Sequence, residues 1–72
     1  MTLMNVEEGK EYIIKCINTD DEELDSFLFS LGCYAGEPIT VIRRRKGSLT
    51  VSIKDGRYSI DPLLGASIFV EE

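Results

Sequence analysis

The pattern of apolar and polar residues along the chain predicts a mainly β protein with short strands. Residues 12–17 form a run rich in β-branched and aromatic side chains, which is typical of a strand. In residues 39–44 and 49–54, apolar and polar side chains alternate, as they do when one face of a sheet is buried. Residues 57–60 and 68–70 have the composition of two further strands. We therefore expect five short strands.

One segment departs from this pattern and predicts a helix over residues 21–31. Its apolar residues recur at i, i+3, i+4 and i+7 and so share one helix face: Leu24, Phe27, Leu28 and Leu31. Asp20 is the expected N-cap, with Glu23 three positions later in the manner of a capping box. Gly32 is expected to end the helix, because glycine readily adopts the left-handed conformation of the C′ position.

Turn signals separate the predicted elements. Gly36 is expected in a turn before residues 39–44, and residues 46–48 should reverse the chain into the next strand. Asp55-Gly56 is a strong signal for a two-residue hairpin. Asp61 and Pro62 have the character of an N-cap and first helical residue, which predicts a short helical turn before the last strand.

These elements predict a single domain over residues 1–72 with the architecture of a small SH3-like barrel. The helix lies between the first two strands, and we expect its apolar stripe to plug one open end of the barrel. Closure of the barrel is expected because it removes the edges that a flat sheet would expose. An OB-fold is the competing architecture, but it usually has longer strands and places its helix later in the chain.

Composition and charge limit the classes of function. The chain has 72 residues, with 13 acids against 8 bases, and five of the acids lie within residues 20–25. It has no His, which excludes the commonest general base and most catalytic zinc sites. The absence of Trp and the net charge of −5 disfavour a stacking platform for nucleic acid. We also find no signal-peptide pattern and no apolar run near the ~20 residues of a membrane span. We expect a cytoplasmic protein that is not an enzyme.

The candidate metal ligands do not converge in this pattern. The acids of residues 20–25 occupy successive helical positions and point in diverging directions, so helix-dipole complementarity explains them. Cys16 alternates with Ile14 and is expected in the core as a small apolar residue. Cys33 follows a helix C-terminus, where the dipole raises the pKa of a thiol. We therefore expect no metal site, no evident cofactor, and weak or absent binding of Fe²⁺ or Zn²⁺ at neutral pH.

A basic run is the first candidate for binding a partner. It consists of four successive residues at a predicted hairpin tip: Arg43, Arg44, Arg45 and Lys46. Alternation with Ile39 and Val41 predicts that Arg43 and Arg45 continue that row beyond the barrel wall. Two interpretations stay open, a solvated tip and a docking patch for an acidic partner surface. Four charges on a net-negative domain would give only weak, non-specific contact with nucleic acid.

Apolar side chains that do not fit the predicted inward faces are the second candidate. Phe29 lies off the helix stripe, Tyr34 follows the helix, and Ile42 is on the outward side of its strand. Scattered exposed apolar residues are normal. Phe29 and Tyr34, however, flank the same helix end, so two interpretations stay open for them, scattered exposed residues and one contact patch for a partner.

The order of several motifs covers nearly the whole chain. They are Leu3, Val6 and Gly9 before Ile14 and Ile17; residues 28–36; Val51, Ile53, Gly56 and residues 58–60; and Ala66 with residues 68–70. Together they resemble the FeoA family, the small cytoplasmic ferrous iron transport protein A. Ala35 stands where the family turn usually has Pro, and Asp25 and Ser26 stand where many members have Arg before the helix leucines.

The resemblance implies an SH3-like fold and a role beside FeoB, the membrane ferrous iron transporter with a cytoplasmic GTPase domain. It also implies transition-metal binding, for which the residues themselves give no site. The same domain shape occurs at the carboxyl end of metal-dependent repressors of the diphtheria-toxin-repressor type. A metal-responsive or dimerisation module is therefore the alternative function.

Overall fold

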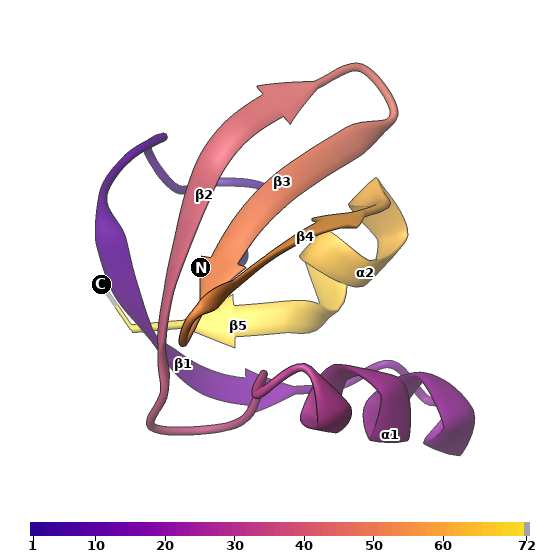
Figure 1. Ribbon diagram of the computed structural model, residues 1–72. Coiled ribbons are helices and arrows are strands. Elements are labelled where there is room, and N and C mark those ends of the chain that lie inside the picture. The colour runs from indigo at the N-terminus through magenta and orange to yellow at the C-terminus, as the bar shows by residue number, and fades with distance from the viewer. Residues whose placement is uncertain (72) are drawn as a thin grey trace.

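The computed structural model describes residues 1–71 and confirms the mainly β architecture (Figure 1). Its elements are β1 (Glu11–Ile17), α1 (Glu22–Ser30), β2 (Pro38–Arg45), β3 (Ser48–Ile53), β4 (Gly56–Ile60), α2 (Pro62–Ser67) and β5 (Ile68–Val70). Each of the five strands and the helix α1 lies within one residue of its predicted bounds. The expected caps of α2 are also present, because the side chain of Asp61 accepts a hydrogen bond from the Leu64 amide and Pro62 opens the helix.

The strands form one antiparallel sheet in the order β4-β3-β2-β1-β5. The long β1 is shared, because residues 11–13 pair with β2 and residues 14–17 pair with β5. This change of partner bends the sheet round its own inner face, as Figure 1 shows.

The expected closure into a barrel is wrong, because within residues 1–71 neither β4 nor β5 has a second strand partner. The outer edge of β5 is instead covered by the start of the chain. Thr2 bridges to Phe69, and the Val70 amide donates to the Met1 carbonyl at 2.8 Å. A protected edge does not need closure to avoid pairing with another chain.

The core lies on the inner face of the sheet. It consists of the buried residues Leu3, Val6, Tyr12, Ile14, Leu28, Cys33, Ile39, Val41, Leu49, Val51, Ile53, Ile60, Ile68 and Val70. The alternating residues of β3 are all in this set, which confirms the period-2 interpretation of that strand. Helix α2 lies close against β3, since a Cβ at Gly65 would collide with the Leu49 side chain.

The expectation that α1 plugs the barrel through a full apolar stripe is wrong. Only Leu28 is buried, Leu31 is half-buried, and Leu24 and Phe27 are 38% and 48% exposed. The physical reason is the position of α1, which lies below β5 and extends past it in Figure 1. Only its last turn therefore reaches the core.

The expected alternation also fails in the second half of β2. A bulge between Val41 and Arg43 shifts the register, so that Arg44 rather than Arg43 lies opposite the buried Leu49. Arg44 is consequently half-buried, and its Nη2 donates to the carbonyls of Leu3 at 3.1 Å and Val6 at 2.8 Å. An extra residue in one strand reverses the faces of every residue that follows it. Arg44 therefore ties the start of the chain to the sheet.

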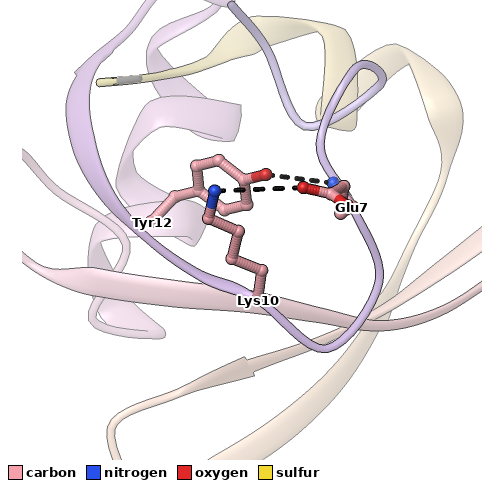
Figure 2. A network of polar contacts seen from close by, with 3 residues as sticks. All are labelled: Glu7, Lys10 and Tyr12. Carbon is pink, nitrogen blue, oxygen red and sulfur yellow. Dashed lines mark hydrogen bonds and ion pairs between the residues drawn. The ribbon is translucent and has the colours of Figure 1, made fainter.

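Tyr12 makes a second tie to the start of the chain (Figure 2). Its hydroxyl accepts a hydrogen bond from the Glu7 amide at 3.1 Å. Lys10 lies over the same ring, with Nζ 5.3 Å from the ring centroid and 3.9 Å from the Glu7 carboxylate. Residues 3–10 are therefore held by both β1 and β2.

The two-residue loop of the β3–β4 hairpin lies one residue earlier in the chain than expected. Ile53 pairs with Gly56, so Lys54 and Asp55 form the two-residue loop, and Lys54 has a positive φ of 53°. Gly56 is the first residue of β4, where the ring of Tyr58 occupies the space that a Cβ would need. The hairpin itself is as predicted, with its two-residue loop moved back by one position.

Candidate partner-binding surface

The carboxyl end of α1 determines where Phe29 points. The Gly32 amide donates to the Phe29 carbonyl at 3.0 Å, and the Cys33 amide donates to the Leu28 carbonyl at 2.9 Å. These two bonds, with a φ of +93° at Gly32, form a Schellman motif. The motif buries Leu28 and Cys33 and leaves Phe29 65% exposed.

The amino end of α1 is capped one residue later than predicted. Asp21, not Asp20, is the N-cap, and its carboxylate accepts hydrogen bonds from the Glu23 and Leu24 amides at 2.9 and 3.3 Å. Asp20 has a positive φ of 60°, which lies outside the extended conformation of an N-cap residue. The capping group is still a carboxylate, so the interaction with the helix dipole is unchanged.

Phe29 and Tyr34 form a stacked pair across the end of the helix. Their ring centroids are 4.9 Å apart and the rings are tilted by 34°. Lys54, from the β3–β4 loop, places its Nζ 5.3 Å from the Tyr34 ring centroid. We call these three residues the aromatic cluster. It joins the end of α1 and the loop after it to the β3–β4 loop, which lies 20 residues further along the chain.

Lys54 is held in the aromatic cluster by an ion pair with Glu37. Hydrogen bonding to the Glu37 carboxylate, and then to Tyr34, raises the pKa of the Lys54 ammonium. Lys54 therefore keeps its charge at physiological pH. Its stem lies over Gly32, where an added Cβ would be 2.8 Å from Cε, so a side chain at Gly32 would displace Lys54.

The loop before β2 is fixed by backbone bonds to β1. The Gly36 amide donates to the Ile14 carbonyl, and the Ile14 amide donates to the Glu37 carbonyl, both at 2.9 Å. Gly36 has a positive φ of 92°, in agreement with the expected turn. Tyr34 and Glu37 are thus presented from a rigid segment, which suits residues that contact a partner.

The two candidate sets from the sequence do not come together. Arg43, Arg45 and Lys46 are exposed near the β2–β3 turn, at the top of Figure 1, whereas α1 lies at the bottom. Arg44 is not available as a docking residue, because its guanidinium is engaged with backbone carbonyls of the chain. Ile42 is 38% exposed, in agreement with its predicted outward position.

A groove between the two helices was not expected from the sequence. It has a volume of about 250 Å³ and is lined by Thr19, Leu24, Asp61, Leu63, Leu64 and Ser67. Leu63 is 81% exposed beside it. The only signal in the sequence was the pair of adjacent leucines after Pro62, which a six-residue helix cannot both bury.

The two cysteines have different environments. Cys33 is buried, and burial raises the pKa of its thiol to about 11. The expected direction is correct, but the cause is desolvation rather than the helix dipole. Cys16 is exposed, so its expected place in the core is wrong. An irregularity in the β1–β5 pairing between Ile14 and Cys16 reverses the alternation there.

Within residues 1–71 no three Cys, Asp or Glu side chains come together as a metal site. No helix of this described part is both long and apolar enough to cross a membrane.

Comparison with known proteins identifies the family. The model of the FeoA domain matches residues 1–72, and the chain belongs to the FeoA family. The fold is also that of a solved iron uptake regulatory protein, FeoA, with a TM-score of 0.86 and 21% identity over 97% of this chain and 93% of that one. No curated protein matches the chain at a significant level.

The same fold forms part of larger proteins. A manganese-dependent transcriptional repressor matches with a TM-score of 0.87 and 19% identity over 97% of this chain and 40% of its own. A manganese-dependent repressor in complex with manganese matches with a TM-score of 0.87 and 20% identity over 99% and 35%. This chain thus spans less than half of either repressor. The SH3-like fold that was predicted is confirmed.

Proposed function

We propose that this protein is a non-enzymatic cytoplasmic accessory of ferrous iron uptake that binds the GTPase portion of the FeoB transporter. Membership of the FeoA family supports the role in iron uptake. The observation that carries the binding site is the stacked pair formed by the exposed Phe29 and the half-buried Tyr34. Aromatic residues on rigid segments concentrate binding energy at protein interfaces.

The aromatic cluster has the features of a preformed contact. The rings are packed against each other before a partner arrives, so little side-chain entropy is lost on binding. Lys54 adds a positive charge beside Tyr34, and this charge is already directed by Glu37. The surface therefore combines an apolar anchor with a polar rim.

The mechanism is a shift between transporter states. An accessory protein changes the activity of its partner only if it binds one conformation more tightly than another. The aromatic cluster would supply that difference if its contact surface on the GTPase portion moves between the nucleotide states.

The test is surface plasmon resonance against the soluble GTPase domain of FeoB. Phe29→Ala and Tyr34→Ala should each raise the dissociation rate about tenfold, which corresponds to about 1.4 kcal/mol. Phe27→Ala is the matched control, because Phe27 is an exposed aromatic on the same helix, about 200° round from Phe29. Equal losses in all three variants would place the contact elsewhere on α1, and unchanged binding in all three would contradict the proposed site.

The alternative function is a metal-responsive or dimerisation module, and the likeness to two manganese-dependent repressors favours it. Calorimetric titration with Fe²⁺, Mn²⁺ and Zn²⁺ under reducing conditions separates the two. We expect no tight 1:1 isotherm with any of these ions, since carboxylates and two separate thiols offer no converged site. Submicromolar binding, or dimerisation on addition of metal, would favour the alternative.

A further inference from the structure

The outer face of the β2–β3–β4 sheet carries a group of exposed cationic side chains. The pairing register places three exposed arginines on it, Arg43 and Arg45 from β2 and Arg57 from β4. Arg43 is opposite Thr50, and Arg57 is opposite Ser52. We call this surface the arginine face. Arg57 was not among the candidate residues predicted from the sequence. Arg44 was among them, but it does not belong to the arginine face because its side chain is engaged on the other side of the sheet.

Hydroxyl groups fill the arginine face between the arginines. They belong to Thr40, Ser48, Thr50, Ser52 and Ser59. The side-chain hydroxyls that form hydrogen bonds within residues 1–71 lie elsewhere, on Thr2, Thr19, Ser30 and Ser67 and on the two tyrosines Tyr12 and Tyr34. The face therefore offers hydrogen-bonding groups that the described part of the fold does not use.

The charges of the arginine face are also uncompensated. The ion pairs within residues 1–71 are Lys10–Glu7 and Lys54–Glu37, and neither involves these arginines. Two acids border the face: Glu11 is opposite Thr40, and the Glu8 carboxylate accepts from the Arg44 amide at 2.6 Å. The five acids of residues 20–25 lie in and just before the first turn of α1, at the bottom of Figure 1, whereas Arg43 and Arg45 lie near the β2–β3 turn at the top.

We propose that the arginine face binds an extended polypeptide segment in which acidic residues occupy alternate positions. Arg43 and Arg45 are two residues apart on one strand, so their Cα atoms are separated by about 6.7 Å. Alternate side chains of an extended segment repeat at the same distance and on one side, which brings successive carboxylates to successive arginines. Arginine pairs with carboxylates bidentately, and the free hydroxyls serve the remaining polar groups of the segment.

The observations favour a peptide over a nucleic acid or an anionic membrane. The whole chain carries a net charge of −5, which repels a long, densely charged polyanion more strongly than a short acidic segment held against one face. The ring of Tyr58, the aromatic residue of β4, is on the inner side opposite Val51, so it gives bases no platform for stacking.

The experiment measures binding of a fluorescent peptide of about twelve residues, in which glutamate and serine alternate, by anisotropy at low and physiological salt. The double variant Arg43→Gln/Arg57→Gln should weaken binding at least tenfold, and wild-type affinity should fall as salt rises. The matched control is Lys10→Gln/Lys15→Gln, which changes the net charge equally on the β1 side and should stay within about twofold of wild type. Circular dichroism melts check that both variants fold.

Four outcomes would overturn the proposal. The first is no binding of the peptide at millimolar concentration. The second is an equal loss in the two double variants, which would show a general charge effect. The third is tighter binding of a short single-stranded oligonucleotide, or of vesicles containing phosphatidylserine, than of the peptide. A peptide of the same composition with its glutamates in one block should bind more weakly, and equal binding would contradict the role of alternate spacing. The proposal does not rest on binding to FeoB, so each can fail alone.

Discussion

Helix α1 and strand β3 were both predicted from a regular apolar pattern, yet they are buried very differently. Every apolar residue of β3 is buried, whereas α1 buries only Leu28 of the four residues in its stripe. β3 lies between two hydrogen-bonded strands, so its faces are determined by its neighbours. α1 reaches the core only at its carboxyl end, and its Leu24 only borders the groove beside α2.

The difference in burial between α1 and β3 indicates which apolar residues are free to contact a partner. An apolar pattern shows that residues share a face, but only packing shows that the face is covered. Leu24, Phe27 and Phe29 remain exposed on α1, beside the acids of its first turn, while the arginine face carries exposed cationic side chains.

The largest change in stability is expected at Leu28, the buried residue of α1. Leu28→Ala should lower the free energy of unfolding by about 2–5 kcal/mol, because it leaves a cavity in the core. Leu24→Ala should lower it by less than about 0.5 kcal/mol, since that side chain is exposed. Urea titration of both variants measures the contrast. Similar losses would mean that α1 packs through its whole stripe after all.

A second contrast lies within the basic run. Arg44→Ala should destabilise the protein by about 2–4 kcal/mol, because it leaves the carbonyls of Leu3 and Val6 without their charged donor. Arg43→Ala should have almost no effect on stability, since its side chain is exposed. Thermal melts of the two variants give the comparison. An Arg44→Ala variant as stable as the wild type would contradict the inward position that the β2 bulge gives this residue.

A smaller effect is expected from the buried thiol at the base of α1. Burial raises the pKa of Cys33 from 9.0 to about 11, so the unfolded chain loses its proton first as the pH rises. The stabilisation is complete below about pH 8 and should decline between pH 9 and 11, by about 1–2 kcal/mol. Urea titrations of wild type and Cys33→Ala at pH 7, 9 and 10.5 measure this decline.

The Cys33→Ala variant should lose less stability over that pH range than the wild type, although its stability at pH 7 is lower because of the lost packing.

Iodoacetamide should alkylate the exposed Cys16 in the native protein and leave Cys33 unmodified until urea is added. Equal alkylation of both thiols in the native state would contradict the buried position of Cys33.

The helices and strands and their order along the chain could be predicted from the sequence. Local patterns carry this information, because strand alternation, the apolar spacing of the helix, Gly32 at its end and the Asp61-Pro62 start each act within a few residues. The motif order also pointed to the FeoA family, and the paired positions of Phe29 and Tyr34 followed from their places on either side of one helix end.

Which side of each helix or strand is covered depends on tertiary contacts and could not be predicted in full from the sequence. The bulge in β2 and the irregularity in β1 exchange the faces of Arg44 and Cys16, and neither leaves a local signal, since a strand with one extra residue has the same composition as a regular strand. The same is true of Lys54 and Arg57, which join the aromatic cluster and the arginine face through contacts between distant segments. Period and composition act within one segment, whereas burial and charge pairing depend on what the rest of the chain places beside it.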